Sequence, residues 1–201
     1  MTSDPIAQAA AAARGGELIV VPTDTVYGIG TRPDDALATA RIFEAKERSR
    51  DLELPVLGAG VDALRGVAIF DELAERLAEE YWPGALTLVL PRAVKSREWQ
   101  LGGTQTTVGV RIPRHPLALA VLAATGPLAV SSANRSGRPP AETCEELERT
   151  FGTLVAVYLC EEGPLVGQPS TVLDLANGEP RVLRPGAINL SLLDSRPSPG
   201  E

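Results

Sequence analysis

Residues 17–30 read ELIVVPTDTVYGIG, and this stretch decides the class of fold. An apolar run at 17–21 leads into the polar loop 22–25, and a second run rich in Val, Ile and Gly follows at 26–30. Short runs of β-branched residues bounded by turn residues are typical of strands. Apolar residues then recur at helical spacing over 34–46. We therefore predict a strand, a polar loop, a second strand and a covering helix, which is the beginning of an α/β domain.

The rest of the chain continues this alternation of helices and strands. Helices are predicted at 4–14, 70–81, 116–125 and 143–151, and strands at 54–58, 86–90, 106–112, 128–131, 155–159, 170–173 and 181–183. We see no internal repeat and no linker that divides the chain. The prediction is a single α/β domain, residues 1–188, with a twisted, mixed parallel and antiparallel sheet flanked by helices. Residues 189–201, rich in Ser, Pro and Gly, are predicted to form a flexible tail.

The composition is that of a globular protein. The chain has 201 residues, of which 44% are hydrophobic and 22% charged, and a chain of this size can bury ~70% of its unfolded surface without a disulfide or metal. No apolar run reaches the ~18 residues of a membrane span, and the N-terminus lacks the pattern of a secretory signal. Cys144 and Cys160 form no CxxC pattern. We expect a cytoplasmic protein with no membrane contact and with both thiols free.

The charge distribution favours small anions over nucleic acid as ligands. The formal net charge is −7, which argues against a broad nucleic-acid-binding surface. Lys46 and Lys95 are the only lysines, so nearly all positive charge is arginine. Arginine recognises phosphate and carboxylate through a planar fork. A bias in genomic base composition explains the same preference, and the two interpretations can both hold.

Several common enzyme classes do not fit the sequence. His115 is the single histidine, so a zinc site with His and Cys ligands lacks partners, and a Ser-His-Asp hydrolase lacks its GxSxG turn. Neither lysine follows a glycine, which excludes a P-loop. Gly28-Ile29-Gly30 begins like a dinucleotide-binding fingerprint, but Pro33 stands where the third glycine belongs.

Polar side chains gather in five places where strands or helices end. These are residues 22–28, 46–50, 106–111, 131–140, and 168–174 together with 181–186. The first can bind a small polar ligand or form a turn in which Asp24 caps backbone N–H groups. The second can hold phosphate or favour a helix dipole. Arg111 lies among apolar strand residues and therefore needs a partner carboxylate or a ligand, of which we favour the ligand. The fourth presents donors to an anion.

The clusters contain ordered sequence blocks. The blocks are Pro22-Thr23-Asp24-Thr25-Val26-Tyr27-Gly28-Ile29-Gly30, Lys46-x-Arg48, Trp82-Pro83-Gly84, Val110-Arg111-Ile112-Pro113, Ser132-Ala133-Asn134-x-Ser136-Gly137, and Ser170-Thr171-Val172 with Leu183-Arg184-Pro185-Gly186. In this order they resemble the signature of the YrdC-like family, the threonylcarbamoyl-adenylate synthases. Each block alone is weak, whereas the ordered set is specific and covers about residues 17–188. The chain resembles the short, single-domain form of the family.

The resemblance implies a reaction. L-threonine, bicarbonate or CO2, and ATP would yield L-threonylcarbamoyl-adenylate and pyrophosphate, with ATP as a substrate and Mg²⁺ on its triphosphate. The threonine nitrogen would attack CO2, and the carbamate would then attack the α-phosphate. The product would serve a downstream threonylcarbamoyl transferase that modifies tRNA, and a weak contact with tRNA is also expected. Because no strong general base appears in the sequence, we expect catalysis mainly by positioning and charge stabilisation.

The resemblance also implies site residues, and no metal-ligating residue is among them. The catalytic residues are Lys46 and Arg48, the threonine-binding residues are Thr23, Arg111 and Thr171, and the ATP-binding residues are Lys46, Arg48, Thr107, Ser132, Asn134 and Arg184. The chain departs from the usual family pattern at Ser49, Glu53, Leu57 and Glu142. These departures bear on the detail of the nucleotide and threonine pockets.

Two alternative functions stay open. One is a non-catalytic RNA-binding module of the same fold, which the acidic composition disfavours. The other is a related carbamoyl-adenylate enzyme that uses a different amine or carbamoyl phosphate. That activity is usually part of a larger multidomain protein, which the length of this chain disfavours.

Overall fold

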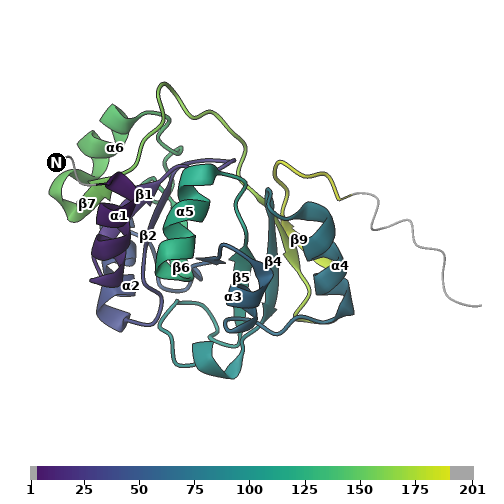
Figure 1. The fold of residues 1–201 in the computed structure, drawn as a ribbon. Helices are drawn as coiled ribbons and strands as arrows, with labels where there is room; N and C mark the ends of the chain where they lie inside the picture. Colours follow the sequence, from purple (N-terminus) through teal and green to yellow (C-terminus); the bar gives the residue numbers. More distant parts are fainter. Residues whose placement is uncertain (1–3, 191–201) are drawn as a thin grey trace, which may run out of the picture.

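A single sheet organises residues 4–190, the part of the chain that the computed structural model describes (Figure 1). Its nine strands are β1 Leu18–Val21, β2 Gly28–Thr31, β3 Val56–Leu57, β4 Leu86–Pro91, β5 Thr107–Arg111, β6 Leu128–Ser132, β7 Val155–Tyr158, β8 Thr171–Asp174 and β9 Arg181–Arg184. They lie in the order β7-β1-β2-β6-β3-β5-β4-β8-β9. The pairs β1–β7, β3–β5 and β4–β8 are parallel, and the other pairs are antiparallel. The predicted mixed α/β fold is confirmed.

The helices form where the sequence carries start and stop residues. They are α1 Pro5–Arg14, α2 Ala36–Lys46, α3 Val61–Arg65, α4 Glu72–Tyr81, α5 Pro116–Thr125 and α6 Cys144–Phe151, with 3-10 turns η1 Val94–Ser96 and η2 Gly152–Leu154. Asp35 caps α2 by accepting hydrogen bonds from two backbone N–H groups, and Pro116 occupies the first turn of α5, where a missing N–H costs nothing. Every predicted helix is present. The one-and-a-half-turn α3 and the two 3-10 turns were not predicted.

Helices cover one part of the sheet and leave another part open. In β1, Leu18 and Val20 belong to the core cluster that contains α2, whereas Ile19 and Val21 belong to the cluster that contains α1 and α5, as the alternation of a strand requires. Figure 1 shows α1 and α5 side by side on their face of the sheet. That face continues past them over β5, β4, β8 and β9, and there it lines a cavity.

Close packing of two strands explains a glycine in the opening stretch. β2 pairs with β6, and a Cβ added at Gly30 would lie 2.7 Å from the carbonyl oxygen of Ala129. A larger residue would therefore push the two strands apart. The glycine that resembles part of a dinucleotide fingerprint serves strand packing instead.

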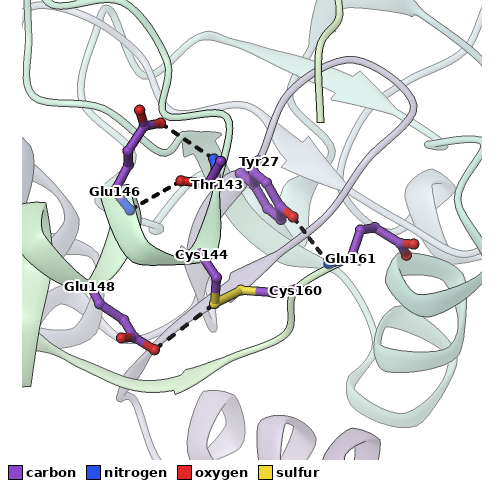
Figure 2. The surroundings of a disulfide bond; sticks show 7 residues. All are labelled: Tyr27, Thr143, Cys144, Glu146, Glu148, Cys160 and Glu161. Carbon is purple, nitrogen blue, oxygen red and sulfur yellow. Dashed lines mark hydrogen bonds between the residues drawn. A yellow bond between two sulfur atoms is a disulfide. The ribbon is translucent and has the colours of Figure 1, made fainter. Parts of the chain in front are cut away.

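Cys144 and Cys160 form a disulfide with their Cα atoms 5.7 Å apart (Figure 2). The prediction of free thiols is therefore wrong. The two residues lie 16 apart in the sequence, but α6 and β7 lie between them and turn the chain back, so that the start of α6 meets the residue that follows Leu159. Sequence spacing alone does not report such an approach.

The described chain ends inside the packed structure. Leu190 is buried and belongs to the main core cluster. Residues 191–201 lie outside the described part, so the predicted tail at 189–201 and the domain boundary at 188 stay predictions. Within residues 4–190 no helix combines the length and the apolar character that crossing a membrane requires.

Candidate functional site

A cavity of about 630 Å³ lies on the open part of the sheet. Its floor includes β5, from which Thr107, Gly109 and Arg111 face the cavity. The intervening Val108 and Val110 are completely buried in the core on the opposite face. The alternation of polar and apolar residues in this strand therefore separates the cavity from the core.

The same alternation explains a predicted residue that does not reach the cavity. In β8, Val172 and Asp174 line the cavity, whereas Thr171 is buried and does not line it. The Thr171 hydroxyl donates to the Ile188 carbonyl at 2.6 Å and accepts from the Ile188 N–H at 3.0 Å. Thr171 thus fastens the chain after β9 to the sheet. Its predicted contact with threonine stays a prediction, and this geometry does not favour it.

A chain of hydrogen bonds organises the loop after β1. The Thr23 hydroxyl donates to the Val26 carbonyl at 2.6 Å, and it lies 3.0 Å from the Thr25 hydroxyl. Because the single proton of Thr23 is used, the Thr25 hydroxyl is the donor in that pair. Arg111 Nη1 in turn donates to Thr25 Oγ1 at 3.0 Å. The loop is a turn, as one interpretation of the sequence had it, and Thr23 and Thr25 also line the cavity.

Arg111 has the partner carboxylate that the sequence left open. Its Nη2 donates to Asp24 Oδ1 at 2.6 Å, and its Nε donates to the Gly84 carbonyl at 2.8 Å. Asp24 Oδ1 also accepts from the backbone N–H of Arg114 at 2.8 Å. The buried Arg111 therefore reaches the cavity already oriented by three partners. We favoured a ligand over a carboxylate, and the structure shows the carboxylate while leaving the side chain in the cavity wall.

Lys46 supports the loop after β6 rather than the cavity wall. The side chain is buried, and its ammonium donates to the backbone carbonyl of Ser132, to that of Asn134 at 2.6 Å and to Asn134 Oδ1 at 3.4 Å. Burial, and then the charge of Arg48, lower the pKa of Lys46 to about 7. Ser132 and Asn134 line the cavity, whereas Lys46 is not among the described residues that do. Lys46 thus acts on the cavity through the loop.

Asn134 gives this loop its shape. Its side-chain amide donates to the carbonyls of Arg135 at 2.9 Å and Arg138 at 2.7 Å. Lys46 donates to both carbonyl oxygens of Asn134. Asn134 thus links the buried end of α2 to the backbone of this loop. The backbone at residues 133–138 is therefore fixed next to the cavity, which suits a loop that presents groups to an anion.

Arg48 and Arg184 project charge into the cavity without a carboxylate partner among the described residues. Arg48 Nη2 donates to the Glu53 carbonyl at 3.0 Å, while its buried Nε has no hydrogen-bond partner in residues 4–190. Arg184 Nη2 donates to the carbonyl and the hydroxyl of Ser170, at 2.8 and 3.1 Å. Ser170 Oγ in turn lies 2.8 Å from Thr87 Oγ1.

Four arginines line the cavity, Arg181 among them, and the pKa is lowered at three, which are Arg48, Arg111 and Arg184. Burial lowers the pKa of Arg48, Arg111 and Arg184 from its ordinary value. The charge of Arg184 lowers the pKa of Arg48 and of Arg111 further, while Asp24 opposes the shift at Arg111. Arg111 is buried, Arg48 half-buried and Arg184 exposed, and the mutual repulsion of the three positive charges is relieved when an anion joins them. The arrangement is suited to binding a ligand with more than one negative charge.

An ion pair between the buried Arg92 and the half-buried Glu53 was not predicted from the sequence. Glu53 and Thr107 line the cavity, and Glu53 Oε1 accepts from Arg92 Nη2 at 2.9 Å. Burial raises the pKa of Glu53, which its bond to Arg92 opposes. Arg92 Nε also donates to the Thr107 carbonyl at 2.7 Å. The one signal for this pair in the sequence is that Glu53 departs from the usual family pattern.

The described residues form no carboxylate cage for a metal. No group of three or more His, Cys, Asp or Glu side chains converges anywhere in residues 4–190. Both oxygens of Asp174, the other carboxylate in the cavity, are hydrogen-bonded, to the Ala176 N–H at 2.9 Å and to the Asn177 amide at 3.0 Å. Because Mg²⁺ is often held by substrate phosphates and one or two carboxylates, we assign it no site on the protein.

Known proteins share both this sequence and this fold. The Sua5/YciO/YrdC family model, described as "Telomere recombination", matches residues 11–186. The chain belongs to this family. A relative from Mycobacterium tuberculosis H37Rv, provisionally named threonylcarbamoyl-AMP synthase, is 44% identical over 186 residues, which are 92% of this chain and 85% of the relative. The threonylcarbamoyl-AMP synthase of Chromohalobacter salexigens is 39% identical, over 89% of this chain and 96% of its own.

A solved structure places the fold in the same family. The crystal structure of P. abyssi Sua5 complexed with L-threonine matches with a TM-score of 0.84 and 36% identity. The match covers 94% of this chain and 56% of that chain, so this chain spans a little over half of the length of Sua5. The resemblance that the sequence blocks indicated is confirmed at the level of family and fold.

Proposed function

We propose that this chain is an L-threonylcarbamoyl-adenylate synthase, a nucleotidyltransferase that uses L-threonine, bicarbonate or CO2, and ATP. The observation that carries the proposal is the set of three guanidinium groups, Arg48, Arg111 and Arg184, in one cavity. Threonine, bicarbonate and ATP bring a carboxylate, an anion and a triphosphate, and each suits a guanidinium partner. The relatives named threonylcarbamoyl-AMP synthase support the same reaction.

The two ends of the arginine set suit different substrates. Arg111 is fixed by Asp24 and Thr25 beside Thr23, so we assign it the threonine carboxylate. Arg48 and Arg184 lack acidic partners in the described chain, and they lie close enough for the charge of Arg184 to lower the pKa of Arg48, so we assign them the phosphates. Thr107 and Asn134 complete the nucleotide side of the cavity. Lys46 contributes by holding the loop.

The reaction needs positioning and charge stabilisation. Carbamate formation joins the threonine nitrogen to the carbon of CO2 and releases a proton. A carbamate oxygen then attacks the α-phosphorus, and the bond to the β-phosphate oxygen breaks with release of pyrophosphate. Charge grows on the α-phosphate oxygens in that step, and guanidinium groups already held in place stabilise it without reorganising. Well-oriented reactants can lower the barrier by ~7–11 kcal/mol.

The test is threonine-dependent release of pyrophosphate. Purified chain with ATP, bicarbonate and L-threonine is expected to release pyrophosphate, and Ser132→Ala and Arg184→Ala are expected to weaken this release. The control is Arg76→Ala, which removes a half-exposed arginine of α4 that pairs with Glu72 outside the cavity. Release of pyrophosphate without threonine would favour the alternative carbamoyl-adenylate enzyme, which uses a different amine. Absent turnover, together with tight and salt-sensitive tRNA binding, would favour the RNA-binding module.

The proposed function also implies a cofactor, partners and a location for this protein. We infer that Mg²⁺ arrives with the triphosphate, since the two carboxylates that line the cavity, Glu53 and Asp174, have other partners. A downstream threonylcarbamoyl transferase would consume the adenylate, with a weak tRNA contact at most, because the net charge is −7. We place the enzyme in the cytoplasm, where its substrates and tRNA are available.

A further inference from the structure

The disulfide joins two segments that both border the cavity. Cys144 is the first residue of α6 and follows the loop 133–143, from which Asn134 and Pro140 line the cavity. Cys160 precedes the segment 161–169, whose last residue, Pro169, also lines it. The Cys144–Cys160 bond (Figure 2) therefore cross-links the end of one segment to the start of another, and each segment contributes residues to the cavity wall.

Besides the disulfide, separate contacts hold the segment 161–169, among them the packing of Leu165 against the main core and a hydrogen bond from the Ala187 N–H to the Pro169 carbonyl at 3.0 Å. The segment contains no helix or strand, and its residues are exposed apart from the half-buried Leu165. The Glu161 N–H donates to the buried Tyr27 hydroxyl at 3.0 Å (Figure 2), and the Leu165 N–H donates to the Glu142 carbonyl at 2.7 Å. Glu161 Oε1 also lies 3.1 Å from His115 Nε2. The disulfide adds a side-chain cross-link between the first residue of α6 and the residue that precedes this segment.

The segment 161–169 packs directly against the loop after β1, which contains the partners of Arg111. A Cβ added at Gly167 would lie 1.9 Å from the carbonyl oxygen of Thr25, so the two backbones are in direct contact. The hydroxyl of Thr25 accepts from Arg111, and Tyr27 in the same loop is the partner of Glu161. The position of the segment is thus transmitted to the threonine end of the cavity through two contacts.

We propose that Cys144–Cys160 is a reversible thiol–disulfide site that braces the threonine end of the cavity. The proposal rests on the proposed function, both for the substrate at Arg111 and for the cytoplasmic location. Disulfides in that compartment are usually transient and redox-sensing. Both cysteines are half-buried rather than enclosed, and the exchange requires a dithiol that reaches one of the two sulfurs.

Reduction of the Cys144–Cys160 bond proceeds by thiol–disulfide exchange, in which a dithiol is the reductant. One thiolate of the dithiol attacks a sulfur of the Cys144–Cys160 bond; that bond breaks, and the electron pair leaves with the other sulfur as a thiolate. The second thiolate of the reductant then breaks the mixed disulfide and closes its own disulfide. Two cysteine thiols result after protonation, and the reductant has lost two electrons and two protons. Reoxidation by a disulfide of the same class reverses the sequence.

Reduction is expected to loosen the segment and weaken threonine binding. A wall held in place before the ligand arrives lowers the ordering cost of binding, and the reduced protein loses that advantage at Thr25 and Arg111. We expect the KM for threonine to rise at least threefold on reduction. Amide exchange with solvent should accelerate in residues 161–169 and 22–28, and both effects should reverse on reoxidation.

The experiment compares oxidised, reduced and reoxidised full-length protein, with thiol labelling to confirm each state. The control combines Cys144→Ser with Cys160→Ser, which removes both cysteines of the chain. This variant should match the reduced wild type, with and without reductant. Amide exchange is read without substrates, so it tests the brace even if the protein shows no turnover, in which case the proposed function fails by itself.

Three results would overturn the proposal that the Cys144–Cys160 bond stabilises the threonine end of the cavity. The first is a protein that labels as two free thiols after purification without reductant. The second is equal amide exchange of residues 22–28 in the oxidised and reduced forms, which would make the bond a local crosslink. The third is an active enzyme whose threonine KM does not respond to the state of the two cysteines. If the double variant folds poorly, reversible reduction of the wild type still decides.

Discussion

The buried ammonium of Lys46 makes the stability of the protein depend on pH in a direction opposite to that of a paired lysine. Its pKa is lowered to about 7, first by burial and then by Arg48, whereas an unfolded lysine titrates near 10.4. Below pH 7 both states hold the proton, and the cost of burying the charge is fully present. Above pH 7 the folded state releases the proton and the unfolded state keeps it, so stability rises with pH. Two pH units at ~1.4 kcal/mol each give about 2.7 kcal/mol between pH 7 and 9.

The assay is urea unfolding of the wild type and of Lys46→Met at about pH 6 and pH 9. Methionine keeps the unbranched stem and removes the titrating group, so the contributions of all other groups cancel in the comparison. The free energy of unfolding of the wild type should rise by about 2.7 kcal/mol more than that of the variant. An identical pH dependence would refute the reasoning, because it would mean that the three oxygen acceptors keep the ammonium charged through this range.

Three further substitutions test the cavity and its support. Arg111→Lys should raise the threonine KM on the order of tenfold or more while ATP binding stays near normal, because an ammonium cannot reach Asp24, Thr25 and Gly84 together; an unchanged KM removes the assigned role. Arg48→Ala should weaken ATP binding in calorimetry by ~1.5–3 kcal/mol, and equal binding would return Arg48 to the helix-dipole interpretation. Arg92→Leu leaves the half-buried Glu53 carboxylate without its partner and should lower the free energy of unfolding by ~1–3 kcal/mol; an unchanged urea midpoint would contradict this.

The sequence predicted the elements because their signals are local. Residue alternation in the strands and caps such as Asp35 depend on neighbours in the chain, and the helices and strands lie where these signals are. The order of strands is not local: β1 lies between β2 and β7, and β3 lies between β6 and β5. Such pairings follow from the packing of the whole sheet, and no short window of sequence contains them.

The sequence indicated which residue types belong to the site, but it did not indicate which residues they contact. The sequence identified Arg111 as a buried cation, but Asp24 lies 87 residues away in the chain, and only the fold brings the two together. The predicted contact of Lys46 with the phosphates stays a prediction, and its position at the end of α2 directs its ammonium to the loop after β6. The disulfide was missed because an argument from compartment and CxxC spacing does not consider which chain segments meet.

The distribution of the cavity residues along the chain has a consequence for synthesis on the ribosome. Thr23 and Arg48 emerge early, but Arg184 lies in β9, which pairs with β8, and β8 in turn pairs with β4. A nascent or truncated chain that stops before β8 holds two of the three guanidinium groups and an unpaired β4 edge. Incomplete chains are therefore expected neither to sequester ATP nor to release the reactive adenylate, and catalysis begins only when the last strand joins the sheet.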